Sequence, residues 1–273
     1  MSRAARLLAF ALPSLLACRA DAKAEPAPAA SAAATVAAEA PPPTGCPAEM
    51  VAVEGFCIDR WEAHLVRADG AAHDAAERPP TGARVVARSA AGVLPQGYLS
   101  RTEAAAACQA AGKRLCRARE WYRACSGPGR TAFPYGADEV EGRCNTGKPH
   151  LMQKLFGSVR YTYDAHYNSP QLAREPGFLA RTGENAACVS EAGALDMVGN
   201  LHEWVADDVS GQLAREIPIE AGANMLGDEG SGVFMGGYFS SRGEHGRGCG
   251  YVTATHAADY HDYSTGFRCC RDR

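Results

Sequence analysis

The cysteines constrain this chain more than any other feature. The chain has 273 residues and 11 cysteines, of which Cys18 lies near the N-terminus and the other ten lie between residues 46 and 273. No two cysteines have the spacing Cys-x-x-Cys, so the sequence predicts neither a zinc ribbon nor a thioredoxin-type redox site. An even number of cysteines in an exported protein indicates a disulfide framework. We therefore expect up to five disulfides in the folded part, with Cys18 left over.

The N-terminus has the features of an export signal. Two arginines precede an apolar run over residues 7–16, which is too short to cross a membrane as a helix. The sequence Leu15-Leu16-Ala17-Cys18 resembles a bacterial lipobox, in which cleavage precedes a cysteine that then carries lipid. An ordinary signal peptide is the alternative. We predict a lipoprotein signal peptide over residues 1–17 and lipidation of Cys18, so that the protein is held in the bacterial cell envelope, facing the periplasm or the cell surface.

The composition then divides the rest of the chain. Residues 18–45 are rich in alanine and proline and have no aromatic residue, which predicts a disordered tether. Residues 46–273 leave about 228 residues for one domain that can bury roughly 70% of its unfolded surface. The net charge of −3 gives no electrostatic reason to expect nucleic acid as a partner. The lipid anchor is the only membrane contact that the sequence predicts.

The folded part begins with a predicted hairpin. Short apolar segments on both sides of Gly55 predict two strands, and a Cys46–Cys57 disulfide would staple them. The region from 64 to 97 is rich in loop residues, with one candidate strand at 85–86.

Two helices follow. Ser100 and Glu103 form a capping-box pattern for a helix that ends before Gly112. Residues 118–126 predict a second helix whose buried face carries Trp121, Ala124 and Cys125. Further strands are expected at 133–136, 233–239 and 266–270. The whole pattern predicts an α+β fold of two helices on irregular antiparallel strands, rich in loops and cross-linked by disulfides.

The segment around Gly199 combines a turn with a buried acid. Gly199-Asn200 is a turn signal because both residues tolerate positive φ, and Glu203-Trp204 follows. Glu203 and the backbone carbonyls near Val198, Gly199 and Leu201 are therefore candidate calcium ligands. The alternative is a buried turn in which Glu203 accepts backbone N–H groups and Trp204 fills the core.

Four motifs occur in the order seen in a known family. Together they resemble the formylglycine-generating enzyme family, also called the sulfatase-modifying factor family, over residues 46–273, with a poor match between about 150 and 184. The motifs are Gly112-Lys113-Arg114-Leu115-Cys116 before Glu120-Trp121, Phe133-Pro134-Tyr135-Gly136, Gly193-x-Leu195-Asp196-Met197-Val198-Gly199-Asn200-x-x-Glu203-Trp204, and Gly266-Phe267-Arg268-Cys269.

The resemblance implies several properties. The fold would be C-type-lectin-like. Asn145 would contribute to a second calcium site, although the acidic partner of that site is not identifiable. Cys269 would form a disulfide with Cys125. Enzymes of the family bind copper(I) between two thiolates spaced Cys-x4-Cys, and those positions fall near Ser241 and Gly246 here.

Neither of these two positions carries sulfur, and soft copper(I) needs soft ligands. The nearby Cys249 has no partner at the required spacing, so we expect it in a disulfide, with Cys144 or Cys188 as candidate partners. The sequence therefore predicts no copper site, no catalytic residue and no formylglycine-generating activity.

Two functional hypotheses remain. The first is a calcium-supported binding or scaffold module whose partner is an envelope protein, a peptide or a glycan. The second is a metal-dependent oxidoreductase that uses a divergent site. For the second, candidate iron or zinc ligands are His245, His256, His261, Asp259 and Asp262.

Overall fold

A computed structural model describes residues 45–217 and 228–273 of the chain. The residues that the structure describes belong to one compact unit. The predicted signal peptide, nearly all of the tether and the lipidation site Cys18 lie outside the described residues. No helix in the described part is long and apolar enough to cross a membrane.

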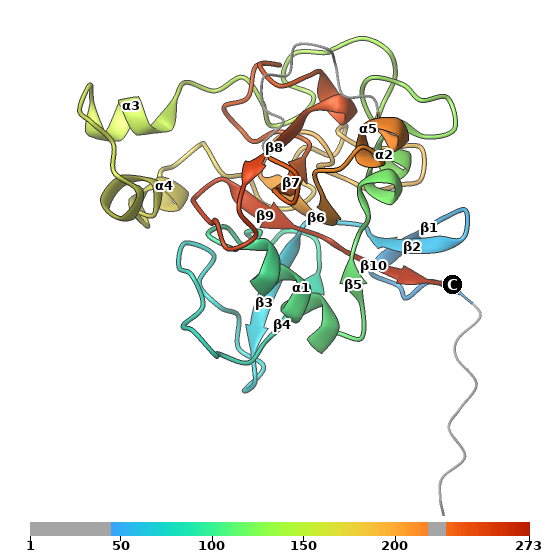
Figure 1. Cartoon of the computed structure of the whole chain (residues 1–273), viewed down its shortest axis with the longest axis horizontal. Helices are drawn as coiled ribbons and strands as arrows, with labels where there is room; N and C mark the ends of the chain where they lie inside the picture. Colours follow the sequence, from blue (N-terminus) through green and yellow to red (C-terminus); the bar gives the residue numbers. More distant parts are fainter. Residues whose placement is uncertain (1–44, 218–227) are drawn as a thin grey trace, which may run out of the picture. The chain divides into compact units, whose positions relative to one another are not determined.

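Within residues 45–217 and 228–273, ten strands form three sheets (Figure 1). One sheet has the order β1-β2-β10-β5, a second pairs β3 with β4, and the third has the order β8-β7-β6-β9. The strands are β1 (Met50–Val53), β2 (Phe56–Asp59), β3 (Ala63–Arg67), β4 (Val85–Ser89), β5 (Arg114–Leu115), β6 (His202–Asp208), β7 (Gly232–Met235), β8 (Val252–His256), β9 (Thr265–Phe267) and β10 (Cys269–Asp272).

Both predicted helices are confirmed. Helix α1 (Arg101–Ala110) has Ser100 at its N-cap, and Ser100 and Glu103 make both hydrogen bonds of the capping box. Helix α2 (Ala118–Ser126) buries Trp121, Ala124 and Cys125, whose spacing gives one apolar face. Shorter helices are α3 (Leu151–Phe156), α4 (Gln171–Arg174) and α5 (Leu213–Glu216), with one π-helical turn at Tyr163–Tyr167.

The predicted N-terminal hairpin is also confirmed. Strands β1 and β2 pair antiparallel, and a Cys46–Cys57 disulfide joins the start of the hairpin to β2. Strand β4 contains the predicted residues 85–86, but its partner β3 lies where loops were expected, because the polar His64 and Arg67 obscure the apolar pattern. Residues 133–136 form a turn with a single bridge and not a strand.

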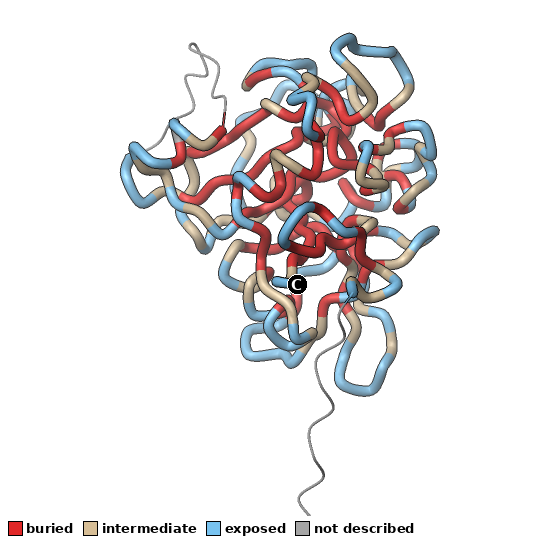
Figure 2. Tube along the Cα trace, turned by 90° about the vertical axis from the view of Figure 1, so that its right-hand side faces the viewer, coloured by how far each residue is buried: buried red, intermediate tan, exposed pale blue. Residues whose placement is uncertain are grey.

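The buried side chains form three hydrophobic clusters, and the exposed residues lie mostly in the connecting loops (Figure 2). Trp121 packs in a core cluster with Met197 and Val205, while Trp204 belongs to a second cluster with Leu99 and Phe267. A third cluster contains residues of the 151–179 segment, whose aromatic rings pack on their own domain against Phe239.

The last strands complete two of the three sheets. Strand β9 lies parallel to β6, and β10 lies between β2 and β5. Arg268 separates β9 from β10 and is completely buried. The C-terminus therefore lies beside the β1–β2 hairpin, as Figure 1 shows.

Candidate functional site

The Gly199-Asn200 turn lies at the centre of the domain. Gly199 and Asn200 have φ angles of 80° and 59°, and a Cβ on Gly199 would lie 2.2 Å from the Asn145 carbonyl oxygen. Only glycine therefore fits at position 199. The Asn200 amide donates to Glu62 at 2.5 Å and accepts from the Asn145 amide at 2.7 Å. The turn thus joins three segments that are distant in the sequence.

Glu203 lies on β6 and is almost fully buried. Arg268 donates to its two carboxylate oxygens, from Nε to Oε2 at 2.5 Å and from Nη2 to Oε1 at 2.6 Å. Trp121 Nε1 donates to Oε2 at 2.7 Å. Glu203 thus accepts charge-assisted hydrogen bonds from side chains, whereas the sequence suggested calcium or backbone donors.

Three buried carboxylates share this one guanidinium. Glu62, Asp196 and Glu203 lie close enough to influence one another and Arg268 electrostatically. Burial, reinforced by its two acidic neighbours, raises the pKa of Glu62 well above its usual range. Burial also raises the pKa of Asp196 to about 6. When all three acids are ionised, two negative charges have no compensating charge within the cluster.

One atom of this acid cluster has no partner in the structure. Asp196 Oδ2 accepts from the Gly183 amide at 2.6 Å, but the buried Oδ1 accepts no hydrogen bond. Buried carboxylate oxygens are normally paired, so an unpartnered one indicates a proton, a water or a cation. Oδ1 of Asp196 and the remaining lone pair of Glu203 Oε1 are hard oxygen donors of the kind that a hard cation binds. Within the described residues no three His, Cys, Asp or Glu side chains form a metal-binding group, so any cation here needs backbone carbonyl ligands as well.

Asn145, the predicted ligand of a second calcium ion, makes its side-chain hydrogen bonds through its amide nitrogen. It donates to the Phe178 carbonyl at 2.9 Å, and the Lys148 ammonium donates to the same carbonyl at 2.7 Å. The second calcium site at Asn145 stays a prediction.

Ser241 and Gly246 line one cavity of about 210 Å³. A Cβ on Gly246 would lie 2.4 Å from the Gly250 carbonyl oxygen, so this position has no room for a cysteine side chain without a backbone shift. The Ser241 hydroxyl accepts from the Tyr238 amide at 2.9 Å. The other lining residues are Phe133, Glu139, Thr146, Val198, Gly236, Arg242, Gly243, Arg247, Gly248 and Tyr251.

All ten cysteines of the described residues form disulfides. Cys249 is bonded to Cys125, so the expectation that it pairs with Cys144 or Cys188 is wrong, as those two bond to each other. The predicted Cys125–Cys269 disulfide is also wrong, because Cys269 bonds to Cys108 on α1.

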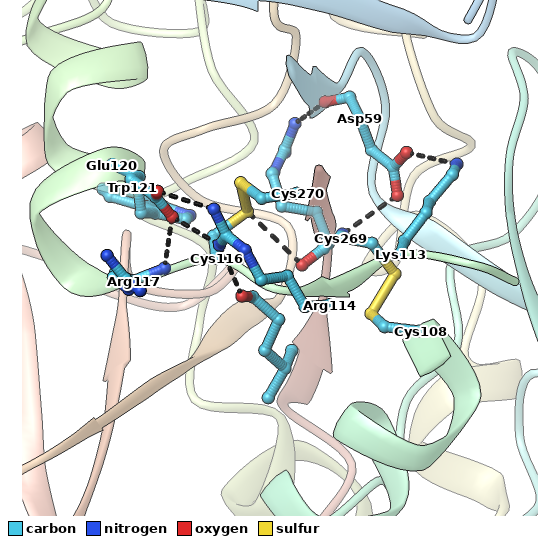
Figure 3. The surroundings of a disulfide bond; sticks show 12 residues. Asp59, Cys108, Lys113, Arg114, Cys116, Arg117, Glu120, Trp121, Cys269 and Cys270 are labelled. Atoms are coloured by element: carbon cyan, nitrogen blue, oxygen red, sulfur yellow. Dashed lines mark hydrogen bonds and ion pairs between the residues drawn. A yellow bond between two sulfur atoms is a disulfide. The ribbon is translucent and has the colours of Figure 1, made fainter. Parts of the chain in front are cut away.

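The adjacent cysteines of β10 serve different partners, because successive side chains of a strand point to opposite faces. Figure 3 shows Cys269 pointing to Cys108 and Cys270 pointing to Cys116. Cys125 lies on α2 and is bonded to Cys249, which lies in a 3-10 turn before β8. The Gly-Phe-Arg-Cys motif could not distinguish a Cys125–Cys269 disulfide from a Cys108–Cys269 disulfide.

The candidate iron or zinc ligands do not form a metal-binding group of three side chains within the described residues. The His256 ring stacks on Tyr260 at 3.8 Å, and His261 Nδ1 lies 2.7 Å from Asn168 Oδ1. His245 packs against Tyr251. These contacts give each ring a structural partner in the described part of the chain.

Sequence reasoning missed two residues of the acid cluster. The sequence predicted Arg268 only as part of the last strand, and it did not identify Glu62 as a member of this cluster. Glu62 accepts from Asn200 and from the Leu201 amide at 3.1 Å. The only signal for either residue was a charged side chain next to an apolar strand, which does not reveal a partner 139 positions away.

Comparisons with known proteins agree with this architecture. A family model described as "Sulfatase-modifying factor enzyme 1-like domain" matches residues 30–273. A search of curated proteins gave no match. The mixed helix and strand architecture with five disulfides confirms the predicted α+β, C-type-lectin-like fold.

Solved structures with similar folds share little sequence with this chain. PvdO from Pseudomonas aeruginosa is 16% identical over 80% of each chain, with a TM-score of 0.45. CarF is 19% identical over 78% of this chain and 59% of its own, with a TM-score of 0.33. The P3c variant of Major Tropism Determinant is 12% identical over 83% of this chain, with a TM-score of 0.41, and this chain spans about half (53%) of its length.

Proposed function

The chain belongs to the sulfatase-modifying factor enzyme 1-like domain family, and we propose that it acts as a binding module and not as a formylglycine-generating oxidase. One observation carries the proposal. Ser241 and Gly246, which stand where the family resemblance places a copper dithiolate, line a single cavity without sulfur. The nearest cysteine, Cys249, is held in a disulfide and offers no thiolate.

The cavity is suited to a small anionic group. The exposed Arg242 and Arg247 lie at its wall, and the Arg247 guanidinium also covers the Phe133 ring at 5.6 Å. One carboxylate, Glu139, lines the same cavity, which leaves a net positive lining. A volume of about 210 Å³ is smaller than most ligand pockets, so it admits a side chain rather than a whole ligand. We propose that the ligand is an acidic side chain of an envelope peptide or protein.

Peptide binding tests this function. Fluorescent peptides rich in aspartate or glutamate should bind, and matched peptides with asparagine or glutamine should not. The double variant Arg242→Ala/Arg247→Ala should lower the affinity by roughly 30-fold, because two guanidinium contacts contribute about 1 kcal/mol each. Binding of neutral glycans with no peptide binding would overturn the choice of ligand. Oxidation of a cysteine-containing peptide after copper loading would overturn the binding-module function itself.

We further propose that one calcium ion supports the site at the acid cluster. A divalent cation would neutralise the two uncompensated charges of Glu62, Asp196 and Glu203 beside Arg268. Asp196 Oδ1 and Glu203 would hold it, together with the backbone carbonyls of Val198, Gly199 and Leu201. Bound there, calcium would hold the central turn in the conformation that the adjacent cavity requires.

Thermal unfolding tests the calcium proposal. Calcium at 100 times its dissociation constant should stabilise the fold by about 2.7 kcal/mol, and Asp196→Asn should abolish this gain. Magnesium serves as the control cation, because it demands a more rigid octahedral site. An unchanged melting temperature with calcium would show that the acid cluster holds protons instead.

We also propose that Cys18 carries a lipid that anchors the protein in the cell envelope. Incorporation of a labelled fatty acid into the full chain, lost in Cys18→Ser, tests this part. Release of the unmodified protein into the medium or periplasmic fraction would contradict it.

A further inference from the structure

Four backbone carbonyl groups converge on one buried side chain, that of Gln96. Gln96 lies in the segment before α1 and is 1% exposed. Its amide nitrogen Nε2 lies 2.9 Å from the Glu77 carbonyl oxygen and 3.0 Å from that of Gly97. The carbonyl oxygens of Asp74 and Ala75 each lie 3.4 Å from the same nitrogen. Two separate segments of the chain thus direct four oxygens at one point.

The Gln96 amide does not match these surroundings. An amide nitrogen has two hydrogens, so it makes full hydrogen bonds to at most two of the four carbonyls. At the other end of the amide, Oε1 is buried and accepts no hydrogen bond in the described part of the chain. Buried polar atoms are normally paired, so this oxygen indicates a missing ligand.

The spacing of the oxygens fits a calcium coordination shell. The two ends of an amide have the same shape, and a half turn of the group places Oε1 where Nε2 lies. Oε1 is then 2.9, 3.0, 3.4 and 3.4 Å from the four carbonyl oxygens. In a pentagonal bipyramid around Ca²⁺, an equatorial oxygen lies about 2.7–3.1 Å from its two neighbours in the plane and about 3.3–3.7 Å from the two axial oxygens. Octahedral Mg²⁺ would need about 2.8–3.0 Å for all four spacings.

We propose that a calcium ion binds here, held by Gln96 Oε1 and by the four carbonyl oxygens of Asp74, Ala75, Glu77 and Gly97. Backbone and glutamine carbonyl oxygens are both calcium ligands, and water completes a shell of about 6–8 oxygens. Oε1 has no hydrogen bond to lose, and the cation replaces the amide hydrogens at the carbonyls. The Asp74 and Ala75 carbonyls keep their other donors, the amides of Glu77 and Gly97.

The loop that supplies three of these carbonyls also supplies negative charge. The side chains of Asp74 and Glu77 are 48% and 56% exposed, and both pair with Arg174. Two carboxylates against one guanidinium leave one net negative charge beside five neutral oxygens. This low ligand charge predicts a dissociation constant of about 10⁻³ M, in the range of extracellular calcium modules. Bound calcium would fix the loop at 74–77 to the segment before α1.

Thermal unfolding of Asp196→Asn tests this site separately from the acid cluster, because that variant lacks the calcium ligand proposed there. Calcium at ten times its dissociation constant should raise the melting temperature by roughly 3–6 °C. Magnesium, and sodium chloride at matched ionic strength, should have little effect.

Gln96→Glu in the same background distinguishes a bound cation from a hydrogen-bonded amide. The carboxylate has the shape of the amide but no hydrogens, so without calcium it faces four carbonyl oxygens and lowers the melting temperature. Calcium should bind this variant on the order of tenfold more tightly, since one ligand is now charged. Its gain in melting temperature should therefore exceed that of Asp196→Asn alone.

Gln109→Glu makes the same change at an exposed position of α1 and should leave the calcium response unchanged. Failure of calcium to recover Gln96→Glu would overturn the proposal, and so would equal responses of the two glutamate variants. An equal gain from sodium chloride would overturn the choice of calcium. If the acid cluster binds no calcium, the wild type and Asp196→Asn respond alike and the result at Gln96 is unchanged, so the two calcium proposals fail separately.

Discussion

Arg268 and Glu203 form a bidentate ion pair in which the two side chains are 0% and 1% exposed. Arg268 also donates to the Asp59 carbonyl at 3.0 Å and to the Leu195 carbonyl at 2.9 Å. Arg268 therefore links β2, the central turn and β6, and it supplies the only full positive charge within the acid cluster. Removal of one partner from a buried ion pair with these additional hydrogen bonds strongly destabilises the folded state.

Removal of one partner should destabilise the domain strongly. We expect Glu203→Gln to cost about 3–5 kcal/mol in the free energy of unfolding, because the buried Arg268 loses the charged group that accepts its two side-chain hydrogen bonds. Urea unfolding followed by tryptophan fluorescence measures this cost. The double variant Glu203→Leu/Arg268→Met should recover part of it, because neither charge remains. A cost of less than 1 kcal/mol for Glu203→Gln would contradict the arrangement.

Asp196 should make the calcium-free domain less stable as the pH rises. Its folded-state pKa of about 6 lies above the unfolded value of 3.8, so the folded state binds the proton more tightly. The contribution of Asp196 to stability is greatest below pH 4 and falls as the pH rises to about 6, by on the order of 3 kcal/mol relative to Asp196→Asn. Chemical unfolding of the two proteins at matched pH values measures the difference. Calcium should reverse the trend, since it binds the ionised form.

His202 should have the opposite effect. Burial, with smaller effects from His245 and His256, lowers the pKa of His202 from 6.5 to about 3. In this pH range the unfolded state therefore binds a proton at His202 that the folded state does not bind. Stability is lost as the pH falls from 6.5 toward 3. At pH 5 the loss should be about 2 kcal/mol relative to His202→Phe. The phenyl ring suits this site, because Phe234 and Tyr238 surround it.

The disulfides should differ in their contributions. Replacement of Cys125 and Cys249 by alanine opens a loop of 124 residues, and the entropic model gives a loss of about 5 kcal/mol. The same change at Cys46 and Cys57 opens only 11 residues and should cost about 3 kcal/mol. Unfolding in denaturant compares the two. An equal loss would indicate that native-state contacts outweigh loop entropy.

A cysteine pair introduced at the cavity should not create a copper site. Gly246 has a φ of 112°, and its Cβ would meet the Gly250 carbonyl. Ser241→Cys/Gly246→Cys should therefore lower the melting temperature without tight copper(I) binding, whereas Ser241→Cys alone should be tolerated. A competition assay with a copper(I) chelator measures the binding. Tight copper(I) binding by a stable double variant would contradict the geometric argument.

Local patterns predicted the local structure well. The capping box of Ser100 and Glu103 and the apolar spacing in α2 depend on neighbouring residues, and both were confirmed. Strand β3 was missed because its alternation is interrupted by charged side chains. Contacts between residues that lie far apart in the sequence were harder to predict. Cys125 is equally compatible with Cys249 and Cys269 in sequence, and only the packing of α2 against the loop before β8 decides between them.

The candidate site was predicted in part. The position of Glu203 after a tight turn was correct, and Ser241 and Gly246 do lie together in one cavity. The partners of Glu203 come from β9–β10 and α2, through contacts 65 and 82 positions away. A glutamate in sequence gives no indication of whether a cation, a guanidinium or an indole will meet it.

The position of β10 has a consequence for the order in which the domain can fold. Strand β10 pairs with β2 and β5 and supplies two of the five cross-links of the described residues. A nascent polypeptide whose β10 is still inside the ribosome therefore lacks the partner of two strands. The domain cannot close until β10 has left the ribosome.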